Sequence, residues 1–175
     1  MISKKMEEAL NYQVKLEAYA SQYYLAMASW CDREGLDGAA RFLFFQSEEE
    51  REHMMKIFHY IAEVDGHAQA PSVEQPPLEF ASPREVFEKV YEHEQKVTAS
   101  INKLVAISYE EDDYTTLNFL QWYVEEQREE ESQARSILDT IKLIGEGGQS
   151  RYFINQELEK FYQAALAKEA ADTAA

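Results

Sequence analysis

The sequence predicts an all-α protein, a four-helix bundle with one long crossover between the second and third helices and a short fifth helix at the C-terminus. Glycine and proline are sparse. They gather at three joints, 35–38, 66–83 and 145–148, and an acidic stretch at 110–113 forms a fourth joint. The long segments between these joints carry apolar residues three and four positions apart, which is typical of helices packed in a bundle.

The first two segments, 5–34 and 39–65, are expected to form an antiparallel hairpin because the joint between them is short. Each segment has one seam of residues at helical spacing, and such a seam predicts that one face of the helix turns toward a core. The first seam consists of Leu10, Val14, Glu17, Ser21, Tyr24, Ala28 and Cys31. The second consists of Leu43, Gln46, Glu50, His53, Ile57, Tyr60 and Val64.

The connection at 66–82 is expected to cross the whole length of the bundle. A helix of about 28 residues is about 42 Å long. An extended chain of about 17 residues spans about 56 Å. The connection can therefore return to the opposite end and start the third helix parallel to the second. A structureless stretch of this length is uncommon without such a task.

The third and fourth segments, 83–110 and 114–144, are expected to form a second hairpin. Ser82, Pro83 and Glu85 predict the start of the third helix, with a capping serine, proline at the first helical position and the glutamate of a capping box. The third seam consists of Phe87, Val90, Glu94, Val97, Ile101 and Leu104. The fourth consists of Leu120, Tyr123, Gln127, Glu130, Ala134, Ile137, Ile141 and Ile144.

A fifth segment begins at Ser150 and carries apolar residues for which a closed four-helix bundle has no further place. These residues are Tyr152, Phe153, Leu158 and Phe161. They predict either an interface with another subunit or packing across the end of the bundle. We expect residues 1–165 to form one domain and residues 166–175 to form an alanine-rich C-terminal tail.

Composition excludes several classes of protein. The net charge of −16 argues against a nucleic-acid partner, because phosphate binding needs clustered Lys and Arg. No apolar run reaches the roughly 18 residues that predict a membrane span, and the N-terminus lacks the pattern of a secretion signal. Cys31 is the single cysteine, so the chain can form no internal disulfide, and we expect a cytoplasmic protein.

Six polar residues interrupt the apolar seams, and their spacing repeats. They are Glu17, Glu50, His53, Glu94, Gln127 and Glu130. The first three and the last three share one pattern, two intervals of 33 and 3 residues, at an offset of 77. The chain therefore consists of two hairpins with the same polar constellation, which meet face to face near the middle of the bundle.

Buried carboxylates in such a layer require a partner. An isolated buried carboxylate is costly, and several that face one core repel each other, so a bound divalent cation resolves both problems. Carboxylates and one imidazole without a thiolate suit iron or manganese. Carboxylate-bridged di-iron bundles use one Glu from each of two helices and Glu-x-x-His from each of the other two. The first hairpin fits this pattern, and the second has Gln127-x-x-Glu130 in its place.

On these motifs the chain resembles the ferritins, most closely the haem-free bacterial type, over about residues 5–165. The motifs are Glu17 with Tyr24, QSEEEREH at 46–53, YEHE at 91–94 and NFLQWYVEEQREEE at 118–131. The resemblance implies a ferritin-like di-iron domain. It also implies a ferroxidase that oxidises Fe(II) to Fe(III) with O2 and deposits ferric mineral inside a hollow shell of 24 subunits, for iron storage and detoxification.

The resemblance also implies roles for individual residues. One iron is bound by Glu17, Glu50 and His53. The second is bound by Glu50, Glu94 and Glu130, with Glu50 as the bridge, Gln127 close by and Tyr24 beside the site as a hydrogen-bonding or electron-donating residue. A third iron site nearby is implied at four acids, Glu49, Glu126, Glu129 and Glu130.

Three other functions remain as alternatives. A haem-binding bacterioferritin would need His at Glu130 and a haem-ligating Met at Arg51. Met54 and Met55 lie one turn further on and are expected to be packing residues, so we expect no haem. Another di-iron redox protein would need a substrate pocket or an added redox module. A purely structural bundle would have apolar residues at the carboxylate positions.

The remaining candidate residues have weaker signals. His93 precedes Glu94 and is expected to face away from the seam, and His59 and His67 lack a carboxylate arrangement. All three are expected at the surface. Tyr123 and its neighbour Trp122 follow the family pattern, but packing alone is sufficient to explain both residues. Cys31 lies on the first seam and is expected to be buried and unreactive.

Overall fold

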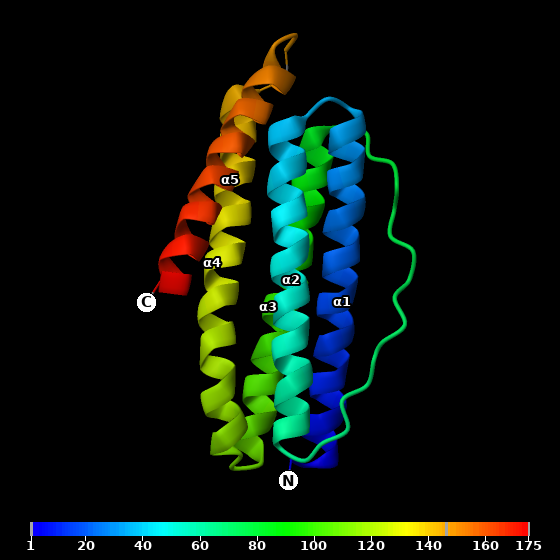
Figure 1. The fold of residues 1–175 in the computed structure, drawn as a ribbon, viewed down its shortest axis with the longest axis vertical. Helices are drawn as coiled ribbons and strands as arrows, with labels where there is room; N and C mark the ends of the chain where they lie inside the picture. Colours follow the sequence, from blue (N-terminus) through cyan, green and yellow to red (C-terminus); the bar gives the residue numbers. More distant parts are fainter. Residues whose placement is uncertain (1, 146, 175) are drawn as a thin grey trace.

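The computed structural model describes residues 2–145 and 147–174, and within them it contains five helices and no strand. The helices α1 (Lys4–Arg33), α2 (Asp37–Glu63), α3 (Pro83–Glu110) and α4 (Tyr114–Ile144) form the bundle, and α5 (Ser150–Ala174) lies beside it against α2 and α4 (Figure 1). This confirms the predicted all-α bundle, whose helix ends agree with the expected segments to within two residues. In the part of the chain that is described, no helix is long and apolar enough to cross a membrane.

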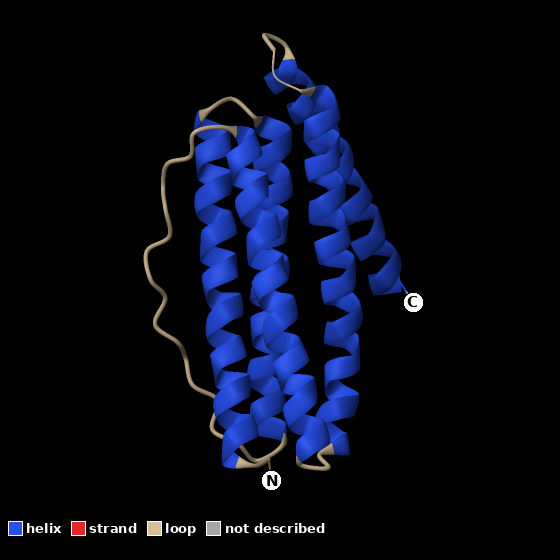
Figure 2. Cartoon of the chain, turned by 180° about the vertical axis from the view of Figure 1, so that it is seen from behind, coloured by secondary structure: helices blue, strands red, loops and turns tan. Residues whose placement is uncertain are grey.

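The crossover runs the length of the bundle along the outer side of α1, as Figures 1 and 2 show. It therefore returns the chain to the end at which α2 began, and α2 and α3 run parallel, as the length of the connection predicted. The side chain of Asn11 holds its first part, because it accepts a hydrogen bond from the backbone of Gln69 at 2.8 Å and donates one to His67 at 3.0 Å. Near its other end, Phe80 packs edge-on against Trp30 with 5.7 Å between ring centroids.

The first three helices end in the same local motif. Gly35, Asp65 and Asp112 have φ of 72°, 63° and 53°, the left-handed conformation that Gly adopts freely and Asp tolerates. In each case the following amide donates to a carbonyl five residues back: Leu36 to Cys31 at 2.9 Å, Gly66 to Ile61 at 2.8 Å and Asp113 to Ser108 at 2.9 Å. Two of the three turns therefore form on aspartate.

The start of α3 has the predicted capping serine. The Ser82 hydroxyl accepts from the Glu85 amide at 3.1 Å. The Glu85 carboxylate reaches back and accepts from the Ala81 amide at 2.6 Å, one residue before the position that a standard capping box uses. Helices α1 and α4 begin on Ser3 and Asp113 in a similar manner, so three of the four bundle helices carry a side-chain cap from their own flanking residue.

The core consists of two apolar clusters with a polar layer between them. One cluster includes Tyr24, Val90 and Ala134, and the other includes Val14 and Val97. On each bundle helix the polar residues of the seam lie between its contributions to the two clusters. The apolar ends hold the four helices together, and they fix the height and facing of the polar residues in the middle.

The sequence predicted that α5 forms either an interface with another subunit or a contact across the end of the bundle. In the structure α5 instead packs along the side of the bundle, against α2 and α4. It is shorter than the bundle helices, but it continues through the expected alanine-rich tail up to Ala174. Leu158 and Ile154 are buried against the bundle, whereas Tyr152 and Phe153 stay exposed. The boundary that the sequence suggested at 165 falls inside this helix.

The contact between α5 and α2 replaces the missing cap of α2. Leu36 provides no side-chain hydrogen bond there, and Asn155 of α5 instead accepts from the Gly38 amide at 2.7 Å and from the Ala39 amide at 3.3 Å. The helices approach so closely that a Cβ on Gly38 would lie 2.3 Å from the Asn155 carbonyl oxygen. Glycine at this position is therefore required by the docking of α5.

We expect Asn155→Ala to lower the free energy of unfolding by about 1 kcal/mol, since it removes the acceptor for two amides at a helix N-terminus. For a chain of this size the loss lowers the melting temperature by about 2–4 °C. Asn155→Asp keeps the acceptor oxygen and should melt within about 1 °C of the unmodified protein. An equal loss for both variants, measured by circular dichroism, would contradict the proposed cap.

Candidate metal centre

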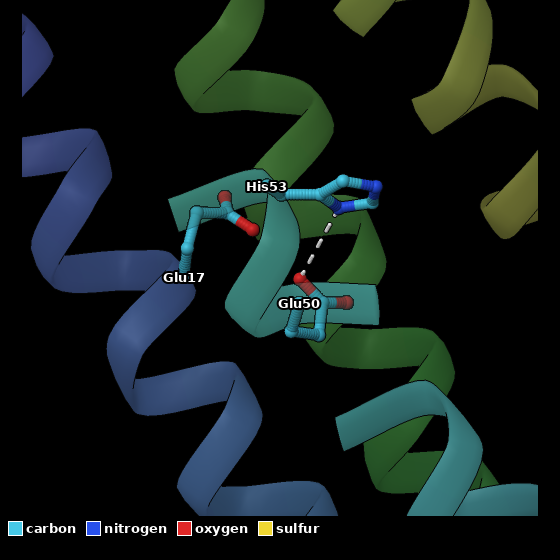
Figure 3. A group of neighbouring side chains, drawn as sticks. All are labelled: Glu17, Glu50 and His53. Atoms are coloured by element: carbon cyan, nitrogen blue, oxygen red, sulfur yellow. Dashed lines mark ion pairs between the residues drawn. The ribbon is translucent and has the colours of Figure 1, made fainter. Parts of the chain in front are cut away.

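The six polar residues of the seams lie in one buried layer. Their exposed fractions range from 0% for Glu17 to 9% for His53. Helix α1 contributes Glu17, α2 contributes Glu50 and His53, α3 contributes Glu94, and α4 contributes the remaining two, Gln127 and Glu130. The 3-residue step on α2 brings Glu50 and His53 to the same side of the helix, and a dashed line in Figure 3 marks the ion pair between them.

Glu17, Glu50 and His53 converge on one point between α1 and α2 (Figure 3). One ligand atom from each lies within 4.8 Å of the others, and His53 Nδ1 is 3.7 Å from Glu50 Oε2, too far for a hydrogen bond. Glu17 Oε2, Glu50 Oε2 and His53 Nδ1 are buried and have no hydrogen-bond partner among the described residues. Three unsatisfied ligand atoms around one point suit a cation, since buried polar groups otherwise find partners.

Glu50, Glu94 and Glu130 form a second group of the same kind, with ligand atoms within 4.8 Å. Glu50 belongs to both groups and lies between them. Glu94 is held on two sides, because Tyr24 donates a hydrogen bond to one carboxylate oxygen and Gln127 Nε2 donates to the other at 2.7 Å. The structure thus places Tyr24 and Gln127 where both act on Glu94.

Glu17 is held by two residues that the sequence did not single out as functional. The Tyr123 hydroxyl donates to Glu17 Oε1, and Gln13 Nε2 donates to the same oxygen at 2.6 Å. The Gln13 amide also donates to the Tyr123 hydroxyl at 3.0 Å, which closes the network. Packing alone therefore does not explain Tyr123. The sequence signal that could have identified Gln13 is its spacing. It lies four residues before Glu17 on the same helix, so the two side chains share one face.

Burial sets the protonation of this layer. It raises the pKa of Glu50 and Glu130 well above the usual range, and the neighbouring carboxylates raise it further. Burial also raises the pKa of Glu94 to about 7, although hydrogen bonds from Tyr24 and Gln127 favour its charged form. The pKa of His53 is lowered, mainly by burial, so its imidazole is neutral and free to coordinate. Without a cation, the layer therefore holds protons at neutral pH.

The acids of the implied third site line one cavity of about 660 Å³ beside this layer. They are Glu49, Glu126, Glu129 and Glu130. Beside this cavity, His53, Glu126 and Glu130 offer ligand atoms within 4.8 Å of one another. This group includes His53 and leaves out Glu49 and Glu129, so it differs from the implied third site. Burial and the charge of Glu126 raise the pKa of Glu49 to about 7. Lys168 of α5 lines the same cavity.

The expectation that His93 lies at the surface is wrong. Its exposed fraction is 5%, and its ring packs against Tyr19, Tyr23 and Tyr24 with centroid distances near 6 Å. Burial lowers its pKa to about 4, so the ring stays neutral. It lies one residue from the seam, where helical spacing leaves the facing ambiguous, and the tyrosines of α1 cover it.

The other weak candidates lie as the sequence predicted. His59 and His67 are exposed. Cys31 is fully buried, and burial raises the pKa of its thiol to about 12, which leaves it unreactive.

Known proteins match this chain over most of its length. A family model of the ferritin-like domain matches residues 7–144. A bacterial non-heme ferritin from Campylobacter jejuni is 48% identical over 159 residues, covering 91% of this chain and 95% of that protein. A bacterial non-heme ferritin from Escherichia coli is 42% identical and covers 90% and 96%. Crystal structures of an open pore ferritin from Archaeoglobus fulgidus superpose with a TM-score of 0.87 at 45% identity, covering 91% and 98%.

We predict that divalent cation binding releases protons and tightens with rising pH. Burial raises the pKa of Glu94 to about 7 and the pKa of Glu50 and Glu130 well above the usual range, and a cation binds only the ionised forms of these groups. Affinity should therefore fall from pH 8 to pH 6. Calorimetric titration with Zn²⁺ in buffers of different ionisation enthalpy measures the protons released at pH 7. Binding heats that do not depend on the buffer would show that the layer is already ionised.

Tyr123→Phe should weaken cation binding at the group of Glu17, Glu50 and His53 by about 10-fold, because residues that orient a metal ligand typically contribute about 10–100-fold to affinity. Zn²⁺ titration at pH 7 measures the change. Tyr109→Phe is the matched control, since it removes the same hydroxyl from an exposed tyrosine on α3. Equal affinities for the two variants would mean that Tyr123 only packs.

Proposed function

Because this chain belongs to the ferritin family, we propose that it oxidises Fe(II) with O2 at the two linked carboxylate groups of its polar layer and stores the ferric product. Iron is both the substrate and the cargo of this reaction. The observation that carries the proposal is the set of buried, unpaired ligand atoms on Glu17, Glu50 and His53, together with a second carboxylate group that shares Glu50.

The donor set suits iron in both oxidation states. Neutral imidazole and carboxylate bind Fe(II), and a ligand set rich in carboxylate favours the higher charge of Fe(III). The named relatives are non-heme ferritins, which supports iron as the metal and argues against haem. Thiolates are absent from the group, since the single cysteine lies buried elsewhere in the core.

The shared carboxylate of Glu50 places two Fe(II) ions close enough to act together. We propose that each ion gives up one electron and that O2 takes both electrons with two protons, which yields two Fe(III) and one hydrogen peroxide. Tyr24 and Gln127 keep Glu94 oriented, while Tyr123 and Gln13 do the same for Glu17. These hydrogen bonds pre-organise the ligands, so little reorganisation is needed when the iron changes charge.

Product removal and storage complete the proposal. Glu130 of the second carboxylate group lines one cavity together with Glu49, Glu126 and Glu129. These four acids provide a third iron site, and the product leaves through this cavity. We propose a hollow shell of 24 subunits around the mineral, in the cytoplasm, in keeping with the family. The exposed apolar side chains of Leu143, Tyr152 and Phe153 at one end of the bundle are available for contacts between subunits.

The alternative functions have less support. A haem-binding bacterioferritin needs a methionine ligand at the position of Arg51, which is exposed. A different di-iron redox protein is disfavoured by relatives that cover 90% or more of the chain and carry the name of ferritins. A structural bundle does not account for buried carboxylates without partners.

Glu50→Gln should abolish rapid iron oxidation and leave the bundle folded. Mutation of a residue that only orients a metal ligand typically lowers metal affinity or activity by about 10–100-fold. Loss of the shared ligand itself should have a larger effect, so we expect an initial rate at least about 100-fold lower. Fe(II) is added in air to the purified protein, ferric absorbance gives the rate, and light scattering with iron analysis gives the iron retained per subunit.

Glu48→Gln is the matched control, because it makes the same change on the same helix at an exposed position. It should oxidise iron at the rate of the unmodified protein. A Glu50→Gln variant that retains the initial rate would disprove the shared-ligand assignment. An unmodified protein that takes up only a few irons per subunit would exclude storage.

A further inference from the structure

Lys168, in the C-terminal half of α5, forms ion pairs with two acids of α4. Its ammonium nitrogen lies 2.7 Å from Glu129 Oε2 and 3.3 Å from Glu126 Oε1. These are hydrogen-bonded ion pairs between residues that are 39 and 42 positions apart. Arg128, on the same helix as the acids, lies farther away, at 3.9 Å from Glu129 Oε1.

The two acids that Lys168 holds are members of the third iron site in the proposed function. A divalent cation at that site needs carboxylate oxygens of the kind that the ammonium now engages. Lys168 also lines the cavity that Glu49 and Glu130 line, so the competitor and the ligands share one space. A divalent cation and an ammonium a few ångströms apart repel each other, so the two occupants exclude one another.

The two halves of α5 are held against the bundle to different extents, and Lys168 lies in the less buried half. The first half of the helix is docked firmly: Asn155 caps α2, Leu158 is fully buried, and Arg151 donates to the Glu34 carbonyl at 3.0 Å. Beyond Tyr162 the helix has no buried residue among those whose side chains are described. A region with few buried contacts opens at low cost, so Lys168 can leave the acids without undocking the whole helix.

We propose that Lys168 is a built-in competitor for the third cation site, and this inference rests on the proposed function. Its ammonium pairs with Glu126 and Glu129 when that site is empty of metal, and an arriving cation displaces it. The site therefore binds cations more weakly than its acids alone would allow. A weak third site favours transit over retention, which suits a position between the oxidation site and the store.

Zn²⁺ titration of the metal-free full-length protein tests this assignment without any redox step. The double variant Glu126→Gln/Glu129→Gln first identifies the binding step that belongs to the third site. Lys168→Gln should tighten that step by about three- to tenfold, since a partly exposed ion pair is worth up to about fivefold and charge repulsion adds to it. Lys168→Arg keeps the charge and should stay within about twofold of the unmodified protein.

Lys160→Gln is the matched control. It removes a lysine from the same helix, but Lys160 pairs with Glu157 on α5 itself, at 2.6 Å, and is not among the residues that line the cavity. A second readout uses the unmodified protein: saturating Zn²⁺ should raise the rate of amine acylation at Lys168 relative to Lys160, as measured by mass spectrometry, because binding and displacement are reciprocal.

Unchanged Zn²⁺ affinity in Lys168→Gln would overturn the inference, as would a double variant that loses no binding step. Either failure leaves iron oxidation by the unmodified protein intact, so it is distinguishable from failure of the proposed function. If the unmodified protein does not oxidise Fe(II), the proposed function fails, and the Zn²⁺ titration by itself decides the role of Lys168.

Discussion

The constraint on which the structure depends is the burial of four carboxylates and an imidazole in one layer. Each carboxylate loses its hydration and faces others of the same charge, which would destabilise the fold if all were ionised and unpaired. The protein limits the cost by protonation when no metal is present, as the raised pKa values of Glu50, Glu94 and Glu130 indicate. The two apolar clusters on either side supply the stability that the layer cannot.

The layer is held by contacts that cross between the two hairpins. Tyr24 of the first hairpin donates to Glu94 of the second, and Tyr123 of the second donates to Glu17 of the first. The repeat of 77 residues relates the candidate ligands, but it does not relate these two tyrosines. Each hairpin thus orients a ligand of the other, so the paired site forms only when both are assembled. The contacts that orient Glu17 and Glu94 are therefore also contacts that join the two hairpins.

Helix α5 adds a link that the four-helix bundle lacks. Its Asn155 provides the cap that the start of α2 does not have, and Gly38 permits the close approach. The same helix places a positive charge beside the acids of α4 some four turns further on. A mutation at the end of the bundle can therefore alter the charge balance near the polar layer through α5, without a change to any candidate ligand.

The sequence by itself determined the helices, the crossover and the polar layer. Helical periodicity and the positions of glycine and proline are local properties, and a carboxylate on an apolar seam is costly enough to require a partner. Only the tertiary structure decided that Tyr123 and Gln13 hold Glu17, that His93 is buried and that α5 lies along α2. These outcomes depend on contacts between residues as far apart as Gly38 and Asn155, for which a single sequence carries no periodic signal. The direction in which a side chain points also matters. A residue one position from a seam, such as His93, can point toward the core or toward solvent, and the neighbouring helix decides which.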